Sequence, residues 1–235
     1  MSTARELTQI HRAQQLLLRR ATVAQMAKLW PALDWARLDA TYPAFAVQVG
    51  RLVQVNRQTS AGLAAQYLRA FRKAHGVPGE LKVVFAQPLI VDQFATSLRV
   101  TSVVAAKGAA SRGVLADLAM SDAFTQASGS MARMVLDGGR ETSMDTISAD
   151  PRAAGWQRVL GGGGCAFCQM LADRGAVYGE ASADFAAHDH CGCSAEPVYG
   201  GEGKSVRDYV PTTRNISDAD RARVRAYLAD NPTAN

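Results

Sequence analysis

The chain has 235 residues, of which 48% are hydrophobic and 20% charged, so it can bury a core as one domain or two small ones. It contains no apolar run of the length that a membrane span requires, which excludes an integral membrane protein and predicts a soluble one. The net charge of +5 is unevenly spread: residues 1–75 hold 11 Lys or Arg against 3 Asp or Glu, a balance of +8, which leaves −3 for the remainder.

The first helix is expected over Arg5–Leu29. Apolar residues recur there at steps of three and four, which predicts a helix with one apolar face. The positions that carry this pattern are Leu7, Ile10, Leu17, Ala21 and Ala24.

Two further helices are expected before residue 75. One runs from Pro31 or Pro43 toward Val55, and the next covers about Thr59–Ala74. These three helices would form a basic surface that suits nucleic acid or an acidic protein partner. Basic residues interspersed along a helix are, however, more often only a solvated face.

The middle of the chain predicts a short β-like patch at Leu81–Phe85 and then two long helices. The first follows Pro88, and the second spans Val114 to about Leu136, with Gly129 in its middle. The sequence Asp-Gly-Gly at 137–139 either ends this second helix or is followed by a helix that resumes through Ile147.

The composition changes after Pro151. Strands are expected at Trp156–Leu160, Ala176–Tyr178 and Ser194–Tyr199, with a short helix at Phe167–Arg174, and one helix, Ser217–Ala229, in a polar tail. The expected fold is α+β and predominantly helical. Its divisions are a helical region at 1–150, a zinc-binding α+β module at 151–200 and the tail at 201–235.

The strongest chemical signal is a cluster of cysteine and histidine residues, written CAFC and then HDHCGC, which predicts one structural zinc ion. Thiolate and imidazole are the ligands that Zn²⁺ prefers, and a structural site takes four of them. Cys165 and Cys168 form the natural first pair, and Cys193 is favoured as the third ligand. Spacing alone leaves the fourth open among three residues. The six candidate donors are Cys165, Cys168, His188, His190, Cys191 and Cys193.

Three other uses of the cysteines were weighed. Two disulfides are disfavoured, because the N-terminal residues show no secretory signal. A redox C-x-x-C normally belongs to a βαβ pattern and would leave HDHCGC unexplained. A cysteine nucleophile served by histidine is the third, but thiolates this close to further donors would more readily capture a metal.

The segment Trp156–Tyr199 resembles the C-terminal module of MuF-like minor head proteins of tailed phages, found especially in phages of actinobacteria. The shared features are the C-x-x-C at Cys165 and Cys168, the R-G-x-V-Y strand at Arg174–Tyr178, the His188–Cys193 cluster and the P-V-Y ending at residues 197–199. The match covers about 44 of the 235 residues at the level of motifs.

The resemblance implies a structural minor capsid protein, present in few copies inside the phage head or at the portal vertex and made in the host cytoplasm. It implies a role in head assembly or genome packaging, with the portal protein, the major capsid protein or both as partners. Packaged DNA would be a further partner through the basic N-terminal region. No contact with a membrane is expected.

Two enzymatic alternatives were considered. A capsid maturation protease is the first, yet the chain has neither G-x-S-x-G nor H-E-x-x-H. A zinc-knuckle nuclease is the second, because His188-Asp189-His190 lies beside the cysteines. Such a site needs a further ligand downstream, and no histidine follows His190. We therefore expect no catalytic residues.

Overall fold

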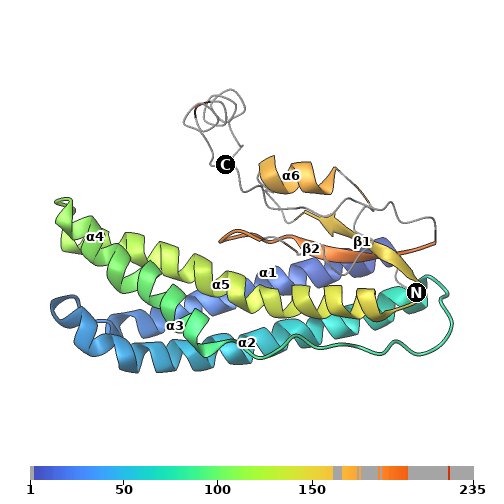
Figure 1. Ribbon diagram of the computed structural model, residues 1–235, viewed down its shortest axis with the longest axis horizontal. Coiled ribbons are helices and arrows are strands. Elements are labelled where there is room, and N and C mark those ends of the chain that lie inside the picture. The colour runs from blue at the N-terminus through green and yellow to red at the C-terminus, as the bar shows by residue number, and fades with distance from the viewer. Residues whose placement is uncertain are drawn as a thin grey trace.

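The computed structural model describes residues 3–160, 166–173, 175, 185, 187–200 and 222. Three long helices lie side by side along the longest axis of the molecule, and a small sheet lies against one end of them (Figure 1). The prediction of a mostly helical α+β fold is confirmed. No helix in the described part is both long enough and apolar enough to cross a membrane. The helices are α1 (Ala4–Leu29), α2 (Leu38–Ala74), α3 (Val91–Arg99), α4 (Ala105–Ser111), α5 (Ala116–Ala149) and α6 (Ala166–Ala172); the strands are β1 (Ala153–Val159) and β2 (Ser194–Tyr199).

Helix α1 begins at a capping box, in which Thr3 and Glu6 each hydrogen-bond the other's backbone N–H. The prediction of this helix is confirmed, but the expected face is not the one that packs. Ile10 and Leu17 are 49% and 62% exposed. The buried side chains of α1 are mostly polar: Thr8, His11, Gln15, Thr22 and Met26.

The two helices expected between Pro31 and Ala74 are one continuous helix, α2. The predicted break after Val55 is wrong, because the polar residues there are buried and bonded across the bundle. Asn56 donates to Thr22 and Gln25 of α1, and Arg57 donates to the carbonyl oxygen of Met134 and to Glu141 on α5. A polar stretch that pairs with neighbouring helices does not need to leave the helix.

Helix α5 also continues through the suspected break at residues 137–139. The two glycines at this point let α2 approach closely. A Cβ on Gly138 would lie 2.5 Å from the carbonyl oxygen of Arg57, and one on Gly139 would lie 2.7 Å from Ser60 Oγ. Ser60 also accepts a hydrogen bond from the backbone N–H of Gly139. The alternative in which the helix runs on past Ile147 is therefore correct.

The remaining bundle is built from α3, a π-helical turn at Val100–Val104, and α4, which together run beside α5 and α2. The hydrophobic core of this half of the bundle centres on large side chains such as Phe45, Phe94, Leu98 and Met131. Trp30 packs edge-on against Phe45 and Phe124, so the turn after α1 closes this end of the core.

The expected β-like patch at Leu81–Phe85 is not a strand. This segment runs along α5, where Thr146 accepts from the backbone N–H of Val84 and Thr142 accepts from that of Ala86. Two threonine hydroxyls, one helical turn apart, satisfy the backbone groups that a neighbouring strand would otherwise bind.

Strands β1 and β2 form a two-stranded antiparallel sheet in which Trp156 lies opposite Pro197 and Val159 opposite Ser194. Trp156 and Ala195 share a hydrophobic cluster with Tyr67, Phe71 and Ile147, so the sheet rests on α2 and α5. The domain limits at 150 and 200 stay a prediction. The expected strand at 176–178 and the tail helix at 217–229 lie outside the described residues, apart from Ala222.

Candidate metal centre

Three of the predicted donors meet at one point. Cys168 at the start of α6 lies 3.5 Å, Sγ to Nε2, from His188 and 3.8 Å, Sγ to Sγ, from Cys191. All three ligand atoms lie within 4.8 Å of one another. Tetrahedral bonds from zinc to sulfur and nitrogen place two sulfurs about 3.8 Å apart and a sulfur and a nitrogen about 3.5 Å apart. The spacing of the donors therefore fits a single tetrahedral zinc ion.

The hydrogen bonding of His188 determines which ring nitrogen faces the other donors. Its Nδ1 lies 2.6 Å from the carbonyl oxygen of Asp189, which can only accept, so Nδ1 carries the proton. The lone pair then lies on Nε2, which faces Cys168. Metal-bound histidines commonly use such a bond to fix the ring.

The other predicted donors differ in where they lie. Cys193 is buried beside Cys191 but is not a member of the three-donor group. Its hydrogen bond to the Cys191 thiol, together with burial, raises the pKa of Cys191 to about 12. The ring of His190 lies against Gly129 of α5. Cys165 lies outside the described residues. The three described cysteines form no disulfide.

Arginine side chains of the bundle hold the backbone of the loop at residues 188–193. The buried guanidinium of Arg140 donates to the carbonyl oxygens of Cys191, at 2.7 Å, and Cys193, at 3.1 Å. Arg19 of α1 donates to the carbonyl oxygen of His190, and Arg133 of α5 pairs with the carboxylate of Asp189. The loop is thus fixed to two helices by side chains outside the three-donor group.

His190 of this loop packs directly against Gly129 of α5. A Cβ on Gly129 would lie 2.3 Å from Nε2 of His190, which is closer than any real contact. His190 itself has a positive φ of 65°, a conformation that turns the chain between Asp189 and Cys191. Gly129, which sequence reasoning treated only as a weak point of the helix, thus makes room for the metal loop.

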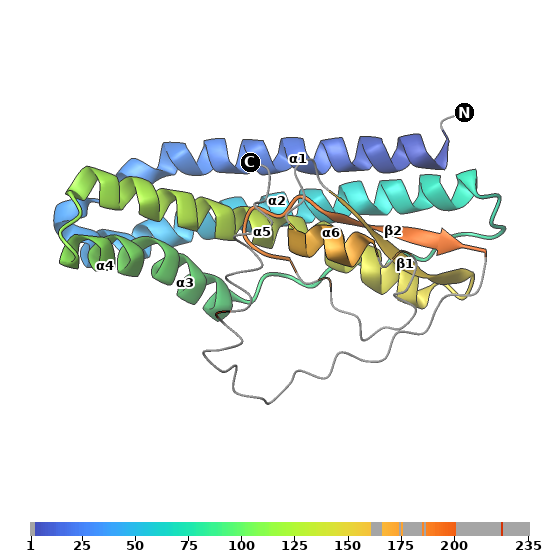
Figure 2. The ribbon, with the colours of Figure 1, turned by 90° about the horizontal axis from the view of Figure 1, so that it is seen from above.

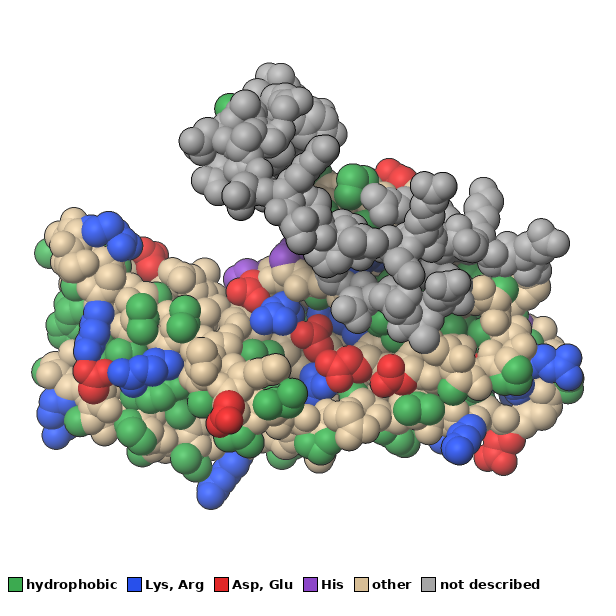
Figure 3. All heavy atoms as spheres, viewed as in Figure 1, with side chains coloured by type: hydrophobic (Ala, Val, Ile, Leu, Met, Phe, Trp, Pro, Cys, Tyr) green, Lys and Arg blue, Asp and Glu red, His purple; other side chains and the backbone are tan. Residues whose placement is uncertain are grey.

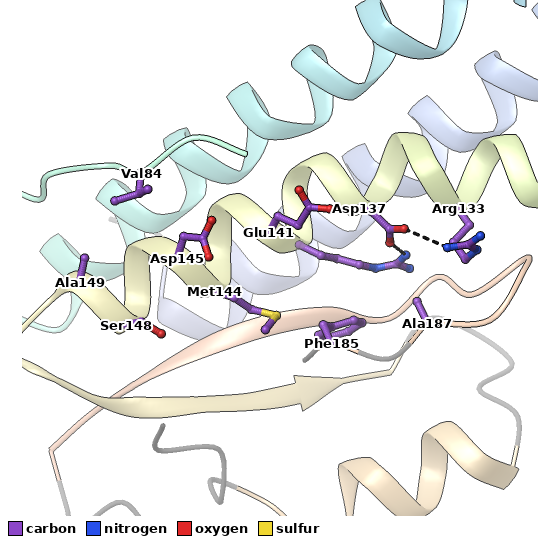
Figure 4. A pocket seen from close by; sticks show the side chains of 11 residues that line it. Val84, Arg133, Asp137, Glu141, Met144, Asp145, Ser148, Ala149, Phe185 and Ala187 are labelled. Carbon is purple, nitrogen blue, oxygen red and sulfur yellow. Dashed lines mark hydrogen bonds and ion pairs between the residues drawn. The ribbon is translucent and has the colours of Figure 1, made fainter. Parts of the chain in front are cut away.

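A cavity of about 750 Å³ opens next to the centre, between α5 and Phe185 (Figure 4). Asp137, Glu141 and Asp145 line it at successive turns of α5, and Figure 3 shows acidic side chains gathered in the middle of this face. Asp137 is paired with Arg133 and Arg140. The carboxylate of Asp137 therefore orients the guanidinium of Arg140, which binds the loop at residues 188–193.

Two other carboxyl groups of this cavity have shifted pKa values. Burial raises the pKa of Glu141, and its ion pair with Arg57 partly opposes the rise. Burial also raises the pKa of Asp145. The pairing of Glu141 with Arg57 joins α5 to α2 at this cavity.

Sequence reasoning missed the arginines and Gly129, since neither type of residue is a metal ligand. One signal was present: Arg133, Asp137 and Arg140 follow one another at steps of four and three, which places opposite charges on one face of the helix. That spacing predicts a charged stripe, but it does not say that the stripe faces the loop at 188–193.

Comparison with known proteins places the chain in a family. The sequence model of the VG15 protein family matches residues 1–215, more than nine-tenths of the chain. No curated protein and no solved structure matches. The match includes the helices, the sheet and the candidate metal centre. The chain belongs to the VG15 protein family and is a phage protein.

Proposed function

We propose that this phage protein is a structural minor capsid protein, of the MuF-like kind, that acts at or near the portal in head assembly or genome packaging. Membership of a phage family supports the class, and the motifs at residues 156–199 support the finer assignment. The observation that carries the structural role is the way in which the candidate metal centre is attached. Three arginines bind its loop to α1 and α5, which suits a staple between the bundle and the sheet.

The ion is proposed to be zinc. Two thiolates and an imidazole at tetrahedral spacing form a donor set that favours zinc over magnesium or calcium, which prefer oxygen ligands. Cys165 is the proposed fourth ligand, because it stands three residues before Cys168 in the C-x-x-C pair. Native mass spectrometry should find one zinc per chain, and a folded protein without metal would contradict the proposal.

Packaged DNA and an acidic portal surface are the proposed partners of the basic N-terminal region. Arg57 and Arg72 are buried in ion pairs with Glu141 and Asp150, so they are not available to a partner. Other basic residues remain exposed: Arg5, Arg20, Lys28, Arg37, Arg51, Arg69 and Lys73. Their contact with DNA would be independent of sequence and weakened by salt. A gel shift with unrelated duplexes at low and moderate salt tests this, and no retardation in either condition would reject it.

A capsid maturation protease is the second candidate function, and the histidines give it little support. His11 is 97% buried and stacks on Tyr67, so no substrate can reach it. His75 is exposed and packs beside the rings of Phe71 and Tyr199, which also contact each other, and no described serine or cysteine is hydrogen-bonded to it. His188 belongs to the metal cluster, and His190 packs on Gly129.

The proposed function is tested in the phage itself. Quantitative mass spectrometry of purified virions should detect the protein at a few copies for each portal. A nonsense mutation in its gene should leave heads that are misassembled or empty by electron microscopy. Absence from both virions and assembling heads would contradict a capsid role, and loss of cleavage of the major capsid protein in the mutant would favour the protease.

A further inference from the structure

Helix α1 has an apolar face, but this face points away from the bundle. Its buried side is largely polar, whereas Ile10, Leu17 and three alanines form an exposed apolar stripe. At 3.6 residues per turn, these positions fall within about 80° of one another around the helix axis. We name them the outer stripe: Ile10, Ala13, Leu17, Ala21 and Ala24.

The outer stripe has no cover within the described part of the chain. Figure 2 shows α1 along one edge of the bundle, with α2 and α5 on a single side of it. Leu17 is 62% exposed in the middle of the stripe. The stripe extends over 15 residues, from Ile10 to Ala24, or about 21 Å of helix. Apolar surface arranged this regularly on a rigid helix is typical of an interface between proteins.

We propose that the outer stripe binds the same stripe of a second copy of this chain, as an antiparallel helix pair centred on Leu17. A two-fold axis at Leu17 places each residue opposite the residue of the other copy that lies equally far from Leu17 on its other side. Leu17 then meets its own counterpart, Ile10 faces Ala24 and Ala13 faces Ala21. The alanines on both sides of the central Leu17 pair are small, which lets the two helices approach closely.

The charges on the same face favour this arrangement. Glu6 and Lys28, both exposed, stand opposite each other in the antiparallel pair. A parallel pair in register would instead place Lys28 against Lys28. Such exposed ion pairs add little affinity, but they select orientation and register.

The first test is the mass of the full, metal-loaded chain in solution as a function of concentration. Analytical ultracentrifugation should show a dimer of the 25.0 kDa chain. Leu17→Glu should raise the dissociation constant at least tenfold. The matched control is Val55→Glu, an equally exposed valine on α2, which should leave it unchanged. A chain that is monomeric up to several hundred micromolar would overturn the proposal, as would equal effects of the two variants.

The second test determines the direction of the pair. Leu17→Cys should form a covalent dimer with a short bismaleimide, above the background given by the native cysteines of the unmodified chain. Ile10→Cys should not form one, because residue 10 of each chain lies opposite Ala24 of the other and the two introduced cysteines are far apart. Equal linking at both positions would indicate a parallel pair and would overturn the arrangement.

A third variant distinguishes the two directions by the size of its effect. Lys28→Glu should weaken the antiparallel dimer by placing two glutamates together, and salt should reduce the effect. The same change would leave a parallel pair nearly unaltered, because it replaces one like-charged contact by another. A further overturning result is protection of α1 from hydrogen exchange only when portal protein is added, since the stripe would then belong to another partner.

Discussion

The guanidinium of Arg140 donates a hydrogen bond of 2.7 Å to the carbonyl oxygen of Cys191, from a side chain that is nearly fully buried on α5. A second N–H of the same group binds the carbonyl oxygen of Cys193. The backbone around two cysteines of the cluster is therefore positioned by the helical bundle as well as by any bound ion. This makes the bundle part of the metal centre.

Replacing Arg140 by glutamine should therefore destabilise both the protein and its proposed metal centre. Two buried carbonyl groups would lose their donor and Asp137 would lose a partner, at a cost of roughly 3 kcal/mol in the free energy of unfolding. Zinc should also pass to a chelator faster. Denaturant unfolding and a colorimetric zinc assay measure the two effects. The control is Arg133→Gln, which removes a partly exposed pair and should cost less than about 1 kcal/mol.

Gly138→Ala should separate α2 from α5. The new Cβ would stand 2.5 Å from a backbone oxygen of Arg57, which cannot rotate away, so we expect a loss of about 2 kcal/mol despite the better helix propensity of alanine. Gly62→Ala on α2 is the control, because nothing lies within 4 Å of its Cβ position. That variant should be about 0.5 kcal/mol more stable than the original. The midpoint temperature of thermal unfolding should thus fall for Gly138→Ala and rise for Gly62→Ala.

Gly129→Ala should destabilise the protein through a clash with one side chain, that of His190. Removing that side chain should restore the stability. The new Cβ would meet the ring of His190, which must swing out and pull on the metal loop, at a cost of about 1 kcal/mol. In a His190→Ala background the obstacle is gone, and Gly129→Ala should become neutral or slightly stabilising. If the cost persisted in the double variant, the close contact between Gly129 and His190 would not be its origin.

The order and type of the long helices could be predicted from sequence, but two boundaries could not. The sequence predicts a break between Val55 and Thr59, within α2, and offers another at residues 137–139, within α5. In the structure the two segments pack together: Gly138 makes room for the backbone of Arg57, whose side chain crosses to Glu141, and Gly139 makes room for Ser60. Polar residues and glycines that are typical of helix ends can stay inside a helix when a neighbouring helix binds or accommodates them. A single sequence does not show which segments will be neighbours.

The same reason explains the metal centre. The sequence predicted the six candidate donors because their chemistry is local and closely spaced. The structure brings together Cys168, His188 and Cys191 across 24 residues. Arg19 lies 171 residues before the carbonyl group that it binds, and no periodicity links the two. Long-range partners of a loop follow from packing alone.

The last prediction concerns acid stability. Burial lowers the pKa of His11 from 6.5 to about 4, and its Nδ1 has no hydrogen-bond partner among the described residues. The unfolded chain therefore binds a proton more tightly than the folded one. Stability is full above pH 6.5, falls as the pH drops from about 6.5 to 4, and changes no further from this group below 4. The integrated loss is roughly 3 kcal/mol.

His11→Phe should remove this loss while keeping a ring stacked on Tyr67. The free energy of unfolding of both proteins is measured by denaturant titration between pH 7.5 and 4. Acid release of zinc affects the two alike, so it cancels when one curve is subtracted from the other. The difference should be flat above pH 6.5 and should grow in favour of the variant below it. A difference that stays constant across the range would show that His11 is protonated equally in the folded and unfolded chain.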